Sequence, residues 1–316
     1  MSTDVITDGG AFHHEALFHG GEDELLAGAL PFIEEGMAGG EPILVAAGDA
    51  TIGLLRSKLN GGPDAVRFED VSDVGRNPAR LIPLWHEFVG THAVAGRPVR
   101  GIAEPVCAER GPAELIECAH HESLLNVAFA DAPEWHLMCA YDTKLLAGAV
   151  IDAARRSHPL VVDAGAVRDN DDYVPPHEGN GMLDDPLPDP SATPHEFGFS
   201  MIALNEMRSF VYEDAKAAGL DPERTANLVL AVSEVATNSV RHAGGHGTVL
   251  SWREPDALVC EVRDKGRIES PLVGRERPSP SQLQGRGLWL VNQLCDLVQI
   301  RSSDSGNVIR LHMQMD

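Results

Sequence analysis

The residues best placed to do chemistry lie in the last third of the chain and begin with Glu234 and Asn238. They stand four positions apart in the segment LAVSEVATNSVRH, residues 230–242. On a helix both side chains share one face, with His242 one turn further along. A carboxylate and a carboxamide oxygen suit Mg²⁺, which takes few protein ligands and keeps water and phosphate oxygens. Asn238 would offer a neutral oxygen and Glu234 could align a water or hydroxyl; a solvated helix face is the competing interpretation.

Two further motifs follow Asn238 along the chain. Asp264 and Gly266 stand at the end of an expected strand, where a carboxylate can accept a hydrogen bond from an exocyclic amine such as that of adenine, and a glycine allows close backbone approach. Gly285, Arg286 and Gly287 open an amphipathic segment, and the amides and dipole of a helix N-terminus attract an anion. Each motif alone also fits an ordinary turn or loop; what is distinctive is their order, a helix with E-x-x-x-N, then a strand with D-x-G, a loop, and G-x-G at a helix start.

The elements that must position these groups belong to the second of two expected domains. A length of 316 residues, 43% apolar and 23% charged, is typical of about two globular domains. Residues 195–316 are expected to form a two-layer α+β sandwich. Its expected helices are 205–218, 222–243 and 287–297, and its expected hairpins pair 248–252 with 258–263 and 298–302 with 307–313.

Residues 1–162 alternate helical patterns with short apolar runs, which predicts a three-layer α/β domain with a mostly parallel sheet. The expected helices are 22–37, 51–59, 79–89, 112–129 and 143–156, and the expected strands 42–47, 66–71, 98–102 and 135–141. Residues 163–194 contain six prolines and few large apolar side chains. We expect them to form an acidic, extended linker.

The net charge of −23, from 25 basic and 48 acidic residues, disfavours direct binding of nucleic acid. Residues 195–316 are nearly balanced, with 13 basic and 16 acidic residues, so a nucleotide could bind there. The sequence has no apolar run long enough for a membrane span and its acidic N-terminus is unlike a secretory signal. The five cysteines form no C-x-x-C pair, which is typical of reduced thiols in a cytoplasmic protein.

Residues 197–313 resemble the Bergerat-fold (GHKL) ATPases. SEVATNSVRHA resembles their N box, RDKG their G1 box and GRGLWLV their G2 box. The short form, without dimerisation helices, is similar to the anti-sigma factor serine kinases of the RsbW and SpoIIAB type. The resemblance implies ATP and Mg²⁺ as cofactors, with Asn238 on Mg²⁺, Glu234 as catalytic base, Asp264 and Gly266 on adenine, and Gly285, Arg286 and Gly287 on the phosphates.

The first domain resembles the MEDS sensory domain of DcmR-type sensors, over residues 13–158. The segments that carry this likeness are RNPARLIPLWHEFV, GRPVRGIAEP, ECAHHESLLNVAF and WHLMCAYD. The two domains together resemble RsbA-type anti-sigma factor regulators. This implies an anti-sigma factor that holds a sigma factor or phosphorylates a serine or threonine of a STAS-domain antagonist. An unknown small ligand or protein at the first domain would control it, and a homodimer is plausible by the same resemblance.

Two departures from the GHKL pattern support an alternative, a non-catalytic partner-binding module with a degenerate ATP site. Ile268 stands where the family has the second glycine of D-x-G-x-G, and Asn307 follows Gly306 where threonine is usual. Residues 269–284, between the boxes, would form a short lid.

Two further hypotheses concern the first domain. Residues 121–126 faintly imitate a histidine-kinase phosphoacceptor box, which would make the chain a hybrid sensor kinase. Metal binding is conceivable but matches no known spacing, so these side chains are expected at the surface or partly buried: His13, His14, His19, His120, His121, Cys107 and Cys118.

Overall fold

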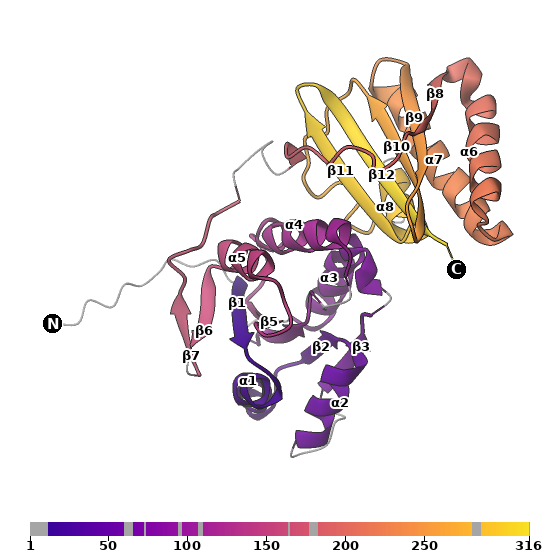
Figure 1. Ribbon diagram of the computed structural model, residues 1–316. Helices are drawn as coiled ribbons and strands as arrows, with labels where there is room; N and C mark the ends of the chain where they lie inside the picture. Colours follow the sequence, from indigo (N-terminus) through magenta and orange to yellow (C-terminus); the bar gives the residue numbers. More distant parts are fainter. Residues whose placement is uncertain are drawn as a thin grey trace. The chain divides into compact units, whose positions relative to one another are not determined.

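The computed structural model describes residues 12–59, 66–72, 74–93, 97–106, 110–163, 165–176, 183–279 and 286–315. The chain divides into two compact units, Met1–Pro176 and His177–Asp316 (Figure 1). No helix among the described residues combines the length and apolarity needed to cross a membrane.

The first unit is built on a seven-stranded sheet with the strand order β3-β2-β4-β5-β1-β6-β7. All neighbouring strands pair in parallel except β6 and β7, which form an antiparallel hairpin. This confirms the expected mostly parallel α/β fold. The strands are β1 (Phe12–His19), β2 (Ile43–Ala47), β3 (Val66–Asp70), β4 (Val99–Ala103), β5 (Trp135–Asp142), β6 (Leu160–Asp163) and β7 (Ala166–Asp169).

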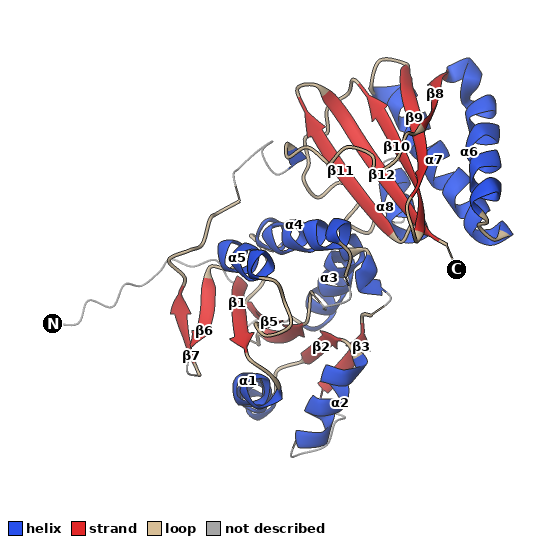
Figure 2. Ribbon diagram, in the orientation of Figure 1, coloured by secondary structure: helices blue, strands red, loops and turns tan. Residues whose placement is uncertain are grey.

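Helices cover both faces of this sheet (Figure 2). Helices α1 (Glu22–Gly39) and α2 (Asp49–Lys58) share a core with one face. Helices α3 (Leu81–His92), α4 (Pro112–Ala128) and α5 (Gly148–Ser157) lie on the other. Gly101 of β4 lets α3 approach, since a Cβ there would lie 2.7 Å from the Trp85 ring. Two 3₁₀ turns, Val74–Arg76 and Pro78–Arg80, precede α3.

Strand β1 is an element that the sequence pattern did not predict, although it lies in the middle of the sheet between β5 and β6. Its sequence, FHHEALFH, has imidazoles and a carboxylate where a buried strand normally has aliphatic side chains. Yet His14 is 0% and Glu15 2% exposed. Its polar residue types did not indicate a central strand, because buried polar groups are the exception in protein cores.

The structure differs from the expected linker at both of its ends. Residues 166–169 form β7 in the sheet of the first unit, and the Asn170 amide donates to the carbonyls of Arg155 and His158 at 2.6 and 2.7 Å. Further along, the Pro188 carbonyl accepts a 2.8 Å hydrogen bond from Arg310 in the second unit. Backbone carbonyls and one amide side chain thus fix parts of a segment that composition marks as extended.

The second unit has a five-stranded antiparallel sheet in the order β11-β12-β10-β9-β8. Its three helices pack on one face and enclose the core, which confirms the two-layer α+β fold. The strands are β8 (His195–Ser200), β9 (His246–Arg253), β10 (Ala257–Asp264), β11 (Leu297–Ser303) and β12 (Gly306–Gln314). The helices are α6 (Leu204–Ala218), α7 (Pro222–His242) and α8 (Arg286–Leu294), and the 3₁₀ turn Met201–Ala203 precedes α6.

Candidate functional site

Helix α7 carries Glu234 and Asn238 on a half-buried face, as their spacing predicts. The helix begins at Pro222, and the Asp221 carboxylate caps it by accepting from the amides of residues 223 and 224 at 2.7 and 3.0 Å. Its core face holds Leu228, Ala231, Val232, Val235 and Ser239, all buried. That packing fixes the rotation of α7 and leaves the face with Glu234 and Asn238 turned out of the core; His242, one turn on, is exposed.

The start of α8 lies directly against this face. A Cβ at Gly287 would lie 3.1 Å from Asn238 Nδ2 and 3.2 Å from Glu234 Oε2, so any larger residue there would have to push these two side chains aside by a few tenths of an ångström. The first amides of a helix have no partner within the helix, and the helix dipole makes this end positive. The first amides of α8 therefore lie close to a carboxylate and a carboxamide, groups that suit a magnesium-bound phosphate.

Asp264, at the end of β10, is held by three hydrogen bonds. Its Oδ1 accepts from the Gly266 amide at 2.8 Å and from Asn307 Nδ2 at 2.7 Å. Its Oδ2 accepts from the Ser239 hydroxyl at 2.6 Å, which ties β10 to α7 next to Asn238. An ionised carboxylate offers about four acceptor positions, so one remains for a further donor such as an adenine amine.

Gly266 fits tightly among the neighbours of Asp264. A Cβ at this position would lie 2.7 Å from the Ala243 Cβ and 2.8 Å from Asn307 Nδ2. The expected close approach of backbone therefore occurs toward the protein's own side chains. The Gly266 amide is one of the three donors that hold the Asp264 carboxylate.

Asn307 and Ile268, the two departures from the family pattern, both belong to one hydrogen-bonded chain. Ser302 donates its hydroxyl to Asn307 Oδ1 at 2.7 Å and accepts from the Ile268 amide at 2.8 Å. The Ile268 side chain is half-buried and packs against the core of the unit. Asn307 therefore links Asp264 to β11. Sequence reasoning missed Ser239 and Ser302, whose serine side chains carry no motif signal.

Arg286 begins α8 and is exposed, and its Nη2 donates to the Ser279 carbonyl at 3.2 Å. Gly285 lies outside the described residues, as do residues 280–284 of the expected lid. The described part of that segment is tied to α8, because Asn292, 1% exposed, donates to the Gly274 carbonyl at 2.9 Å. The structure thus brings Glu234, Asn238 and Gly287 together.

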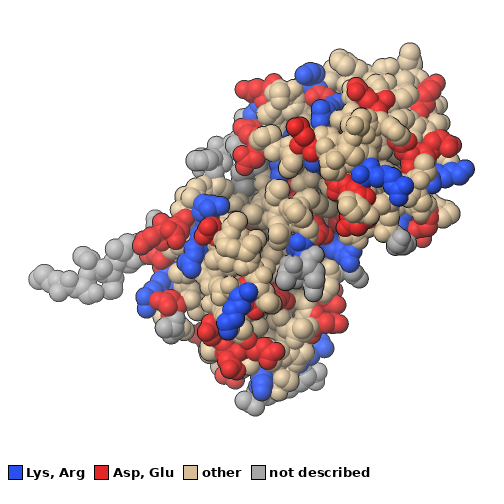
Figure 3. Space-filling view, viewed as in Figure 1, with Lys and Arg blue, Asp and Glu red and all other residues tan. Residues whose placement is uncertain are grey.

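Figure 3 shows one face of the molecule, on which acidic side chains are spread over both units with basic side chains between them. The described residues form no broad basic tract on this face.

Comparison with known families confirms both resemblances. Residues 13–159 match the MEDS family, described as the MEthanogen/methylotroph, DcmR Sensory domain. Residues 197–313 match the histidine kinase-like ATPase domain. No curated protein sequence matches the chain.

Two solved structures share low identity with the chain. One contains the RsbU and RsbW domains of Rv1364c from Mycobacterium tuberculosis, at 18% identity and a TM-score of 0.29, and covers 39% of this chain and 33% of that chain. The other is the Acinetobacter baumannii histidine kinase AdeS, at 13% identity and a TM-score of 0.25, covering 39% and 68%. The chain spans about a third of the length of the first. On the family matches, the chain joins a MEDS sensory domain to a histidine kinase-like ATPase domain.

Proposed function

We propose that the second unit binds Mg·ATP and is an anti-sigma factor that phosphorylates a serine or threonine of a STAS-domain antagonist, under control of the MEDS unit. The observation that carries the nucleotide site is the contact of the α8 start with α7, where Gly287 lies against Asn238 and Glu234. The hydrogen-bonded carboxylate of Asp264, with one acceptor position left, supports an amine-bearing base.

The roles of the residues follow from their chemistry. ATP supplies the transferable phosphoryl group when bound. Asp264 would accept a hydrogen bond from the adenine amine, and the first amides of α8 together with Arg286 would hold the phosphates. Asn238 would give Mg²⁺ an oxygen ligand, and Glu234 would orient the acceptor hydroxyl. Positioning and charge neutralisation carry most of the catalysis in phosphoryl transfer, so few groups are needed.

A protein acceptor is favoured over an internal histidine. His121, the residue that imitates a phosphoacceptor, is 1% exposed on α4, and its Nε2 lies 4.0 Å from a Glu122 carboxylate oxygen. A phosphoacceptor imidazole must be reached by the γ-phosphate, and a neighbouring carboxylate repels that phosphate. This supports transfer to another protein over the hybrid histidine-kinase alternative.

Replacing Glu234 tests the catalytic step. We expect Glu234→Ala to retain ATP affinity and to lose transfer of radiolabelled γ-phosphate to STAS-domain proteins, because the variant keeps every group assigned to the nucleotide. The matched control is Glu223→Ala, an exposed glutamate on the same helix. Transfer by Glu234→Ala at the rate of the control variant would refute the role.

Replacing Asn238 tests the metal assignment. Loss of one oxygen ligand should weaken Mg·ATP about tenfold, the scale of one hydrogen bond to a charged group, and leave magnesium-free ATP binding nearly unchanged. Equal calorimetric affinities of wild type and Asn238→Ala for Mg·ATP would reject the assignment.

The non-catalytic module remains as a second candidate because of Asn307. Its Nδ2 occupies one acceptor position of Asp264, which leaves fewer positions for a ligand. In that case the unit would capture its partner equally well with and without ATP, and no phosphate would be transferred. Equilibrium binding of ATP to the full chain separates the two candidates.

A further inference from the structure

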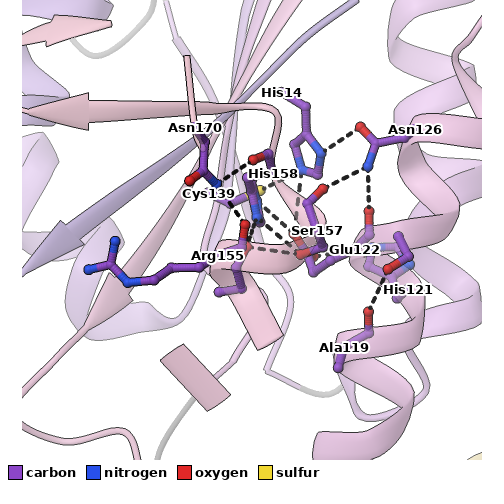
Figure 4. A network of polar contacts seen from close by, with 12 residues as sticks. His14, Ala119, His121, Glu122, Asn126, Cys139, Arg155, Ser157, His158 and Asn170 are labelled. Carbon is purple, nitrogen blue, oxygen red and sulfur yellow. Dashed lines mark hydrogen bonds and ion pairs between the residues drawn. The ribbon is translucent and has the colours of Figure 1, made fainter. Parts of the chain in front are cut away.

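Four side chains that bind transition metals in other proteins meet inside the first unit (Figure 4). Their ligand atoms all lie within 4.8 Å of one another. They come from separate elements, on the face of the sheet covered by α3, α4 and α5: His14 on β1, Glu122 on α4, Cys139 on β5 and His158 just after α5. None of the four is more than 2% exposed.

Hydrogen bonds set the orientation of both imidazoles. His158 Nδ1 lies 2.7 Å from the Ala154 carbonyl, which can only accept, so Nδ1 carries the proton. His14 Nδ1 lies 3.1 Å from Asn126 Oδ1, and the Asn126 amide nitrogen donates to the Ser157 carbonyl at 2.7 Å. His14 Nδ1 is therefore also the donor. In the neutral form each ring then turns the lone pair of Nε2 toward the cluster, and a partner on the other nitrogen is the usual feature of metal-binding histidines.

These lone pairs converge on a carboxylate. Glu122 Oε2 lies 3.1 Å from His158 Nε2 and 3.4 Å from His14 Nε2, but among the described residues neither Glu122 oxygen has a partner of hydrogen-bonding geometry. A buried carboxylate without such partners is costly unless a positive charge adjoins it.

We infer that this cluster binds a divalent transition-metal ion of the zinc class through His14, Glu122, Cys139 and His158. A tetrahedral zinc site with bonds of 2.0–2.3 Å has ligand–ligand separations of about 3.3–3.7 Å. Three of the six separations here are 3.1 and 3.4 Å from Glu122 Oε2 to the two imidazoles and 3.5 Å from Cys139 Sγ to His14 Nε2, and all six are within 4.8 Å. Two nitrogens, a sulfur and a carboxylate oxygen form a donor set that suits zinc.

Binding must displace one proton. A metal ion binds cysteine as the thiolate, so the Cys139 thiol must lose its proton to become a ligand. Formation of the metal–sulfur bond releases that proton to solvent, and the other three donors bind without losing one. One proton per ion is therefore expected.

A second group of potential ligands, His13, Glu134 and His136, is more exposed and contains no cysteine. A signal from a metal–thiolate bond therefore distinguishes the buried cluster from this surface group.

The test uses the full chain and cobalt(II), which replaces zinc and gives a thiolate-to-cobalt absorption band. After dialysis against a chelator, titration with Co²⁺ should produce that band to an endpoint of one ion per chain, and Zn²⁺ should abolish it. Elemental analysis of the protein as purified provides an independent count of the native ion.

Cys139→Ser should lose the cobalt band. The matched control Cys118→Ser, which removes a buried thiol on α4 that donates to the Pro105 carbonyl, should keep it, as should His136→Ala in the surface group. Absence of both the band and a bound ion in the wild-type protein would overturn the inference. A band that persists in Cys139→Ser would overturn it as well. If Cys139→Ser fails to fold, Glu122→Gln is measured instead and should weaken cobalt binding.

Discussion

Asp264→Asn tests whether the carboxylate at the end of β10 recognises the adenine base or only stabilises the fold. The change keeps the shape of the side chain and one oxygen, which can still accept from the Gly266 amide and Asn307. The new amide would then face Ser239, whose hydroxyl lies 3.1 Å from the Val235 carbonyl and can donate there instead. The internal hydrogen bonds therefore survive, and the loss of stability should be small, about 1 kcal/mol.

Ligand binding should respond much more strongly than stability. The one acceptor position left on Asp264 becomes an N–H, so the variant loses a charge-assisted hydrogen bond and points a donor at the adenine amine. A hydrogen bond to a charged group contributes about 1.5–3 kcal/mol, which corresponds to an ATP Kd about 10- to 150-fold higher. Inosine triphosphate, with a carbonyl in place of that amine, should lose less affinity than ATP or gain some.

Calorimetry on the full chain with Mg²⁺ measures both nucleotides. The matched control is Asp304→Asn, which removes the same charge from a fully exposed site on the same unit, beside Arg267. If Asp264→Asn is folded and binds ATP with the Kd of this control, Asp264 does not read the base and the assignment is refuted.

Two further predictions concern stability. Gly306 has a φ of +125°, and a Cβ there would lie 2.0 Å from the Asp264 carbonyl oxygen, so Gly306→Ala should cost more than about 3 kcal/mol in urea unfolding. The control is Gly198→Ala, where an added Cβ would meet open space. Equal urea midpoints for the two variants would show that Gly306 is not under the expected constraint. Burial, and then the charge of Arg310, lower the pKa of His312 to about 4, so its neutral form stabilises the fold above pH 6.5 and this contribution is lost as the pH falls toward 4. Between pH 7 and pH 5 about 2 kcal/mol should be lost; His312→Gln should flatten the profile, and an unchanged profile would count against this account.

The sequence predicted most elements because their patterns are local. The N-cap Asp221, followed by Pro222 and apolar side chains at helical spacing, specifies α7 without reference to the rest of the chain. Apolar runs such as β2 specify buried parallel strands in the same way. Strand β1 was not predicted because His14 and Glu15 are polar, and their burial depends on residues more than 100 positions away.

The sequence allows the residues of the candidate site to be proposed, but not their contacts. The order of the motifs singles out Glu234, Asn238 and Asp264. The bond from Asn307 to Asp264 depends on the register of β10 with β12, which pairs these two residues, and no local pattern encodes that register. The buried cluster proposed to bind a metal was even less predictable from local patterns. Its four side chains become neighbours only through the strand order β5-β1-β6 and the packing of α4.

The most direct test of the nucleotide site is a calorimetric titration of the full chain with ATP, with Mg²⁺ and again with a chelator. The contact of Gly287 with Glu234 and Asn238 predicts one saturable site per chain that weakens when Mg²⁺ is removed. Absence of saturable binding at millimolar ATP, or equal affinity with and without Mg²⁺, would contradict the claim that α7 and α8 form a magnesium–nucleotide site.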